Sequence, residues 1–276
     1  MAIITISHSA FGGGRELAER VASVLDHPCI SRELLIEASK LYGIPEAKFS
    51  EVLESDPHWW KRWRESLRLY RITLQAAMYE LAQKGNLIYH GRAGQEFFLQ
   101  INHVLKVLLI APIEYRLEQV KRYRGVAEKD ARQYLEQVDR IRTRRFKAIF
   151  DADPWDPSRY DLVLNTSHMN LKTAADLVVD AAQKEDFQPD TDSMEAFRDH
   201  TITARVQAAL AVSPNTRHLD VGVQTTQGVV RLHGLIGDAG LEGEIVRIVK
   251  EVSGVGKVTP DFIMTQRSYA AARARE

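Results

Sequence analysis

A short apolar run leads into three consecutive glycines near the start of the chain, and this junction constrains the fold more than any other feature. Ile3–Ile6 is typical of a buried β-strand, and Gly12–Gly14 follows after five residues. Leu17, Val21 and Leu25 then recur every four residues, on one face of a helix. A strand, a glycine turn and a helix in this order predict the opening unit of an α/β domain.

Further apolar runs alternate with helical patterns as far as residue 182. Candidate strands are Leu87–Tyr89, Val104–Ile110 and Leu162–Leu164. Between them, helices are expected near residues 31–41, 67–84, 113–123, 127–148 and 171–182. Unbroken apolar strands suit a parallel sheet that is covered on both faces. Residues 1–182 are therefore predicted to form a three-layer α/β domain, with its ligand site at the carboxyl ends of the strands.

An acidic segment divides the chain. Residues 183–197 hold five acidic residues, one lysine and one proline, a composition that disfavours a packed element. A solvated loop inside a single domain is the alternative. Residues 198–268 then show a helical pattern, two alternating strands around a turn at 226–228, a second helical pattern and a last strand. This order predicts a small α+β domain of the form αββαβ, followed by a charged tail at 269–276.

Composition narrows the classes of protein. The 37 basic residues are balanced by 37 acidic ones, which argues against a protein that coats nucleic acid. Apolar runs fall short of the roughly 20 residues that a membrane helix needs, and the N-terminus lacks the basic region of a secretory signal. Cys29 is the single cysteine, so an internal disulfide is excluded, and the histidines lack zinc-binding spacing. A soluble, cytoplasmic protein is expected.

The three glycines are the first candidate for chemistry. Glycines at the N-terminus of a helix let backbone N–H groups turn toward an anion, and the helix dipole favours negative charge there. The pattern G-x-x-x-x-G-K-[ST] is not met literally. If Gly13 is aligned with the second glycine of the pattern, His8 occupies the position of the first glycine and Gly14 that of the lysine. Arg15 or Glu16 occupies the position of the serine or threonine. Arg15 would restore the positive charge, whereas a tight turn without a ligand is the alternative reading.

A second candidate is the arginine-rich segment 122–145. A mobile lid at this place would bring cations onto a phosphoryl group that is being transferred. A solvated helix face, with Glu136 and Arg140 as a local ion pair, is the alternative. The arginines of this segment include Arg122, Arg124, Arg140, Arg142, Arg144 and Arg145.

Arg92 is the third candidate, because it lies directly after a predicted strand between small residues, in Gly91-Arg92-Ala93-Gly94. Small neighbours let a ligand approach, and a guanidinium can bind a phosphate through two hydrogen bonds. A structural turn is the alternative.

An aromatic stripe falls on one face of a predicted helix, at Trp60, Trp63, Leu67 and Tyr70. Such a stripe is typical of core packing. The alternative is an aromatic wall that stacks the base of a ligand or docks the C-terminal domain.

These features together resemble the cytidylate kinase-like branch of the nucleoside monophosphate kinases, over residues 2–182. The matching pieces keep their order along the whole segment. They are the opening Ile-Ile-Thr-Ile-Ser, the Gly-Gly-Arg-Glu loop end, Ser31-Arg32-Glu33-Leu34-Leu35, Gly91-Arg92-Ala93, Asp139-x-x-Arg142, and the run from Asp156 to Thr166.

The resemblance implies a P-loop fold that transfers the γ-phosphoryl group of ATP to a pyrimidine monophosphate such as CMP or dCMP, with Mg²⁺. It further implies that Arg32 and Arg92 hold the acceptor phosphate, that Gly12, Gly13, Gly14 and Arg15 cradle the donor phosphates, and that Arg15, Arg140 and Arg142 are catalytic. Phe11, Ser31 and Ala93 depart from the pattern of the family. A sensor that binds a nucleotide without turnover is therefore the alternative.

Residues 198–268 resemble a BON domain. The matching pieces are Ile202-Thr-Ala-Arg-Val206, the run Gly228-Val229-Val230-Arg231-Leu232-His233-Gly234, and Gly254-Val255-x-x-Val258. This resemblance implies a module without catalytic activity that binds a phospholipid or protein surface and tethers or regulates its neighbour.

Overall fold

The computed structural model describes residues 2–49, 64–237 and 239–264. The N-terminal part is built on a five-stranded parallel sheet in the order β2-β3-β1-β4-β5. Its strands are β1 (Ile3–His8), β2 (Cys29–Ile30), β3 (Leu87–Gly91), β4 (Val104–Ile110) and β5 (Leu162–Asn165). The three-layer α/β prediction is confirmed, although the two-residue strand β2 was not predicted.

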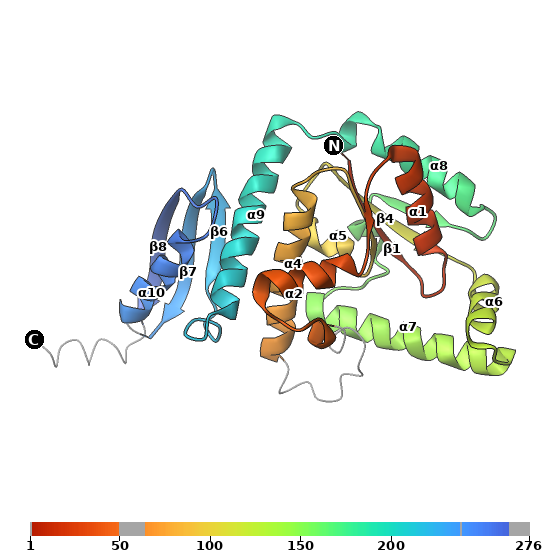
Figure 1. Ribbon diagram of the computed structural model, residues 1–276, viewed down its shortest axis with the longest axis horizontal. Coiled ribbons are helices and arrows are strands. Elements are labelled where there is room, and N and C mark those ends of the chain that lie inside the picture. Colours follow the sequence, from red (N-terminus) through yellow and green to blue (C-terminus); the bar gives the residue numbers. More distant parts are fainter. Residues whose placement is uncertain (1, 50–63, 238, 265–276) are drawn as a thin grey trace, which may run out of the picture.

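Helices cover both faces of this sheet (Figure 1). On one face lie α1 (Gly14–Leu25) and α8 (Leu171–Ala182), and on the other lie α2 (Glu33–Tyr42), α4 (Arg64–Ala82) and α5 (Gly94–Phe97). The helices α6 (Ile113–Arg124) and α7 (Glu128–Phe150) lie at the end of the sheet where β1 finishes. Within the described ranges, no helix is both long and apolar enough to cross a membrane.

Alternation along β1 explains why its apolar run is unbroken. Ile4 and Ile6 pack against α1 and α8, whereas Ile3 packs in the core on the opposite face. Leu17 and Val21 of α1 are buried against the sheet. A strand that is buried on both faces needs apolar residues at every position, as observed here.

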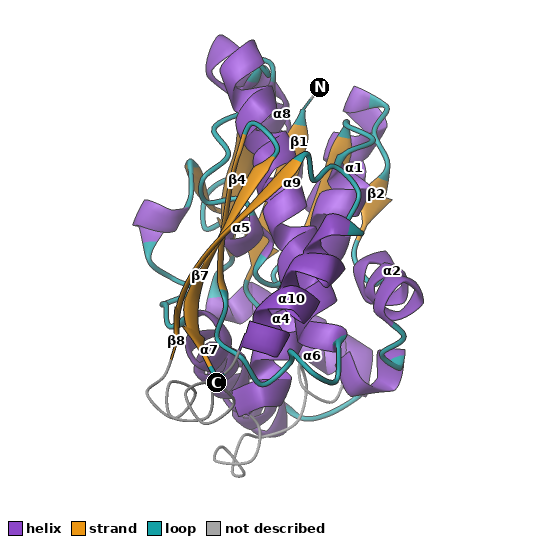
Figure 2. Cartoon of the chain, turned by 90° about the vertical axis from the view of Figure 1, so that its left-hand side faces the viewer, coloured by secondary structure: helices purple, strands orange, loops and turns teal. Residues whose placement is uncertain are grey.

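The C-terminal part contains α9 (Thr191–Val212), β6 (Gly222–Thr226), β7 (Val229–Ile236), α10 (Ala239–Lys250) and β8 (Lys257–Met264). Strand β7 pairs antiparallel with β6 and parallel with β8. Figure 2 shows β7 and β8 side by side, on the side of the molecule that faces the viewer. The turn between β6 and β7 places Gln227 and Gly228 at positive φ, 49° and 72°. The predicted order αββαβ is confirmed.

The prediction that residues 183–197 hold no packed element is wrong. They contain the short 3₁₀ helix η3 (Glu185–Phe187) and the first turns of α9. Asp190 and Ser193 form a reciprocal capping box, which satisfies N–H groups at the start of this helix. Phe197 is buried. The division of the chain into domains at this segment stays a prediction.

Helix α9 packs against α4 of the N-terminal part, as well as against the small sheet (Figure 1). Phe197 lies among Tyr79 and Phe98, with ring centroids 5.3 and 6.3 Å away. Arg205 of α9 donates two hydrogen bonds to the carboxylate of Glu80 on α4. Helix α9 therefore contributes side chains to two cores, the one around α4 and the separate one of the small sheet.

Candidate active site

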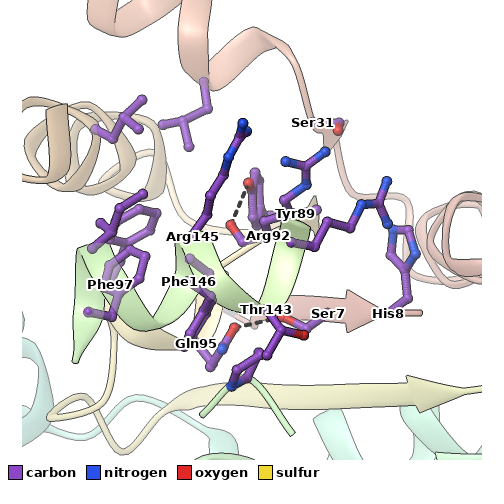
Figure 3. Close-up of a pocket in the computed structure, with 18 of the residues that line it drawn as sticks. Ser7, His8, Ser31, Tyr89, Arg92, Gln95, Phe97, Thr143, Arg145 and Phe146 are labelled. Carbon is purple, nitrogen blue, oxygen red and sulfur yellow. Dashed lines mark hydrogen bonds between the residues drawn. The ribbon is translucent and has the colours of Figure 1, made fainter. Parts of the chain in front are cut away.

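A pocket of about 490 Å³ opens at the carboxyl ends of β1 and β3 (Figure 3). Its volume lies in the ordinary range for small-molecule sites. Among the described residues, five guanidinium groups line it, contributed by the residue before α2, by α4 and α7, and by the segment after β3. They belong to Arg32, Arg71, Arg92, Arg142 and Arg145.

The rest of the lining is largely apolar. It comes from α2, α4, α5, α7 and the segment that follows α7. Its large side chains include Leu34, Leu35, Leu74, Phe97, Phe146, Ile149, Phe150 and Trp155, together with Tyr70 from the predicted aromatic stripe. Trp60 and Trp63 of that stripe lie outside the described residues. A ligand with an anionic end and a flat or apolar body suits such a pocket.

Among the described residues that line the pocket, Asp139 is the one carboxylate. Both of its oxygens accept hydrogen bonds from Nη2 of Arg116, each at 2.7 Å. Its charge is thus already balanced by an arginine outside the lining. The five arginines of the pocket therefore give it a net positive charge that favours a polyanion.

Arg142 is held in an environment that favours an anionic partner. Burial, together with the positive charge of Arg92, lowers its pKa to about 10, so it remains charged at neutral pH. Its Nε is buried, and within the described part of the chain no hydrogen-bond partner reaches it. A buried donor without a partner is costly, and a phosphate oxygen would satisfy it.

The glycine loop, residues 9–13 between β1 and α1, lies beside this pocket. Gly13 takes a left-handed conformation at φ 82°, and Phe11 does so at φ 59°. Helix α1 begins at Gly14, and its first turn closes when Leu17 N–H donates to the Gly13 carbonyl. No side chain from the described ranges caps this helix. Its first N–H groups thus lack intrahelical partners and suit an anion.

His8, at the end of β1, lines the pocket together with Ser7 and Ala10 of the same segment. Its Nδ1 donates a hydrogen bond to the Ser9 carbonyl at 3.0 Å. Burial lowers the pKa of His8 to about 4, and the charges of Arg142 and nearby groups add to this shift. The imidazole is therefore neutral at pH 7.

The structure brings together three of the predicted site residues, Arg32, Arg92 and Arg142. Arg32 also pairs with Glu46 at 2.6 Å. Figure 3 shows Arg92 among the side chains that line the pocket.

Two predicted site residues lie away from the pocket. Arg15 is exposed and pairs with Glu19 on its own helix at 2.7 Å. Arg140 is exposed on α7, because two residues along a helix turn a side chain about 200° away from Arg142. The structure does not bring either guanidinium to the pocket, and their catalytic roles stay predictions.

Arg145 belongs to the predicted arginine-rich segment, although no role was assigned to it. It follows Arg142 by three residues on the same face of α7 and lines the pocket. Two further residues of the site, Arg71 and Arg116, were not predicted. The sequence carries no comparable signal for Arg71 or for Arg116.

Arg116 links the glycine loop to α7 through hydrogen bonds. Its Nε donates to the Ala10 carbonyl at 2.7 Å, and the same side chain holds Asp139 of α7. We expect Arg116→Ala to lower the free energy of unfolding by about 2–3 kcal/mol, because it leaves a half-buried carboxylate and a carbonyl without their partner. Urea denaturation measures this loss. The exposed Arg122→Ala on the same helix is the control, and equal stability of the two variants would contradict the stabilising role of this link.

The described residues do not form a magnesium site of their own. No group of three or more His, Cys, Asp or Glu side chains gathers in the described ranges, and Asp139 is already bound to Arg116. Mg²⁺ in proteins is commonly held by one or two carboxylates and by phosphates of the substrate. No step of the chemistry is therefore routed through a metal that this chain holds.

Comparison with known proteins gives matches over both parts. Residues 3–168 match the model of the cytidylate kinase-like family, and residues 198–266 match that of the BON domain. A cytidylate kinase of Methanopyrus kandleri is 29% identical over 175 residues, which cover 60% of this chain and 84% of that protein. A cytidylate kinase of Pyrobaculum aerophilum is 25% identical over 181 residues, covering 65% of this chain and 92% of that one.

A solved structure shows the same fold. It is an uncharacterised protein from Eubacterium ventriosum, with a TM-score of 0.51 and 19% sequence identity, covering 66% of this chain and 97% of that chain. The parallel sheet, the glycine loop with its arginine-lined pocket and the family match over 3–168 agree with one another. The chain belongs to the cytidylate kinase-like family, and its C-terminal region is a BON domain.

Proposed function

We propose that the N-terminal domain transfers the γ-phosphoryl group of ATP to a pyrimidine nucleoside monophosphate such as CMP or dCMP. The observation that carries this proposal is the cluster of five arginines in one pocket beside the uncapped start of α1. Transfer of a phosphoryl group is promoted mainly by positioning and by positive charge around the transferred group. The apolar part of the lining suits a nucleoside.

In this proposal the reaction needs no covalent intermediate on the protein. An oxygen of the acceptor phosphate forms a new bond to the γ-phosphorus, and the bond from that phosphorus to the bridging oxygen of ADP breaks. Arg32 and Arg92 hold the acceptor phosphate, and Arg142 and Arg145 stabilise the charge on the transferred group. The N–H groups at the start of α1 bind the phosphates of the donor. Mg²⁺, if bound, would be held mainly by the phosphates of the nucleotide and would offset part of their negative charge.

The test is a panel of nucleoside monophosphates with ATP and Mg²⁺. We expect ADP to form when CMP or dCMP is added, and the same ligands to raise the melting temperature of the chain. A ligand at one hundred times its Kd stabilises the folded state by about 2.7 kcal/mol. Absence of ADP formation with every monophosphate, at concentrations that stabilise the chain, would contradict the kinase proposal.

That negative result would favour a second function, a nucleotide sensor. One observation supports it: α4 lines the pocket with Tyr70, Arg71 and Leu74 and also packs against α9. A ligand that moves α4 would thus also shift α9 and, with it, the C-terminal domain. In either case we propose that the BON domain tethers or regulates the protein at a phospholipid or protein surface in the cytoplasm.

A further inference from the structure

Compared with a standard phosphate loop, this chain has its glycine and its long polar side chain at exchanged positions, 14 and 8. The standard pattern places a glycine at position 8 and a lysine at position 14. In this structure a Cβ atom built on Gly14 would lie 2.1 Å from both Cγ and Cδ2 of His8. The imidazole thus fills the space through which a side chain at position 14 would leave the backbone.

We propose that this is a reciprocal exchange, in which His8 replaces the missing lysine and contacts the phosphates of the bound nucleotide. The inference rests on the proposed function only in that the pocket binds a nucleotide. It assigns to His8 a binding role that the glycine pattern alone does not indicate.

The orientation of His8 leaves one nitrogen for the ligand. Its Nδ1 donates to the Ser9 carbonyl, so the neutral ring carries its proton on Nδ1, and Nε2 is the nitrogen left for a phosphate. The ring lies in the pocket that also holds Arg92 and Arg142 (Figure 3). Three groups from different elements are thus placed to surround one anion.

The charges around His8 predict how it responds to a nucleotide. Three groups face the ring: Arg142 from α7, His90 within β3 and Arg92 directly after β3. Together with burial, they lower the pKa of His8 to about 4. No acidic group is among these neighbours within the described residues. A polyphosphate reverses the local sign of charge and raises the pKa, so that Nε2 gains a proton and donates to a phosphate oxygen. Binding should therefore take up a proton.

The first experiment measures this proton. The full chain is titrated with a non-hydrolysable ATP analogue by calorimetry at pH 6.5, in buffers of different ionisation enthalpy. We expect the wild-type chain to take up as much as about one proton per nucleotide more than His8→Gln, which keeps a polar side chain of similar size. Equal proton uptake by the two proteins would overturn the proposal.

The second experiment reverses the exchange. Gly14→Lys alone should lose nucleotide affinity, because its side chain collides with the imidazole. The double variant His8→Gly/Gly14→Lys removes the collision and restores the standard pattern. We expect it to bind the analogue at least ~10-fold more tightly than Gly14→Lys, a gain of about 1.4 kcal/mol or more. A double variant that folds, by circular dichroism, but binds no better than Gly14→Lys would overturn the proposal.

Turnover separates this inference from the kinase proposal. If His8 contacts the transferred phosphoryl group, His8→Gln should lower kcat about 10²-fold. ADP formation that is unchanged in His8→Gln, together with proton uptake equal to that of the wild-type chain, would overturn the role of His8 and leave the kinase proposal standing. Proton uptake that depends on His8, without ADP formation, would uphold the role of His8 and contradict the kinase proposal.

Discussion

Replacing Arg92 and Arg142 together by alanine should abolish phosphoryl transfer and leave the fold intact. Both guanidinium groups line the pocket, and Arg142 has a buried Nε that a ligand would satisfy. A single cation that stabilises the transferred phosphoryl group is worth about 10³–10⁵ in rate, so we expect a loss of at least ~10³-fold in kcat/KM. ADP formation from ATP and CMP is the measurement.

The matched control is Arg132→Ala, which removes an exposed arginine from the same helix as Arg142. It should keep the activity of the wild-type chain. Melting curves of both variants show whether a loss of activity comes from the missing guanidinium groups or from unfolding of the protein. Because the positive charges of the pocket repel one another, the double variant should be no less stable than the wild-type chain. Full turnover in the double variant would remove Arg92 and Arg142 from the site.

Replacing Phe197 by alanine should destabilise the protein by about 3–5 kcal/mol, the usual cost of removing a buried aromatic side chain. The ring is buried in the core around α4, beside Tyr79, Phe98 and His103. Denaturation in urea measures the effect. We expect the loss of stability in the N-terminal domain as well, since the cavity opens against α4.

Arg198→Ala is the control for this prediction, because Arg198 is the exposed neighbour of Phe197 on the same helix. It should change the free energy of unfolding by less than about 0.5 kcal/mol. If Phe197→Ala behaves like this control, α9 does not contribute to the core of the N-terminal domain.

Local patterns in the sequence predicted most of the fold. The strands β1, β3, β4 and β5 have continuous apolar runs, and their helices have clear four-residue spacing, so both could be recognised without tertiary information. Strand β2 has only two residues and offers no period to detect. The beginning of α9 was missed for a different reason. Its acidic residues lie toward solvent, and the capping box and one buried ring, Phe197, hold it in place.

The site was predicted in part, and helical geometry explains the rest. Arg92 was recognised from its place after a strand, and Arg142 from the resemblance to the family; both line the pocket. Arg140 was expected beside Arg142, although residues two apart face opposite sides of a helix. The role of His8 depends on its contact with Gly14, which only the folded loop creates.

The sharing of α9 between two cores has a consequence for how the protein is made. A chain is synthesised from its N-terminus, at about 5–20 residues per second. The face of α4 that carries Tyr79 therefore stays uncovered until residues 191–212 have left the ribosome. The enzyme-like domain can complete its packing only once the first helix of its neighbour has emerged, so the nascent chain passes through a stage with an exposed aromatic surface.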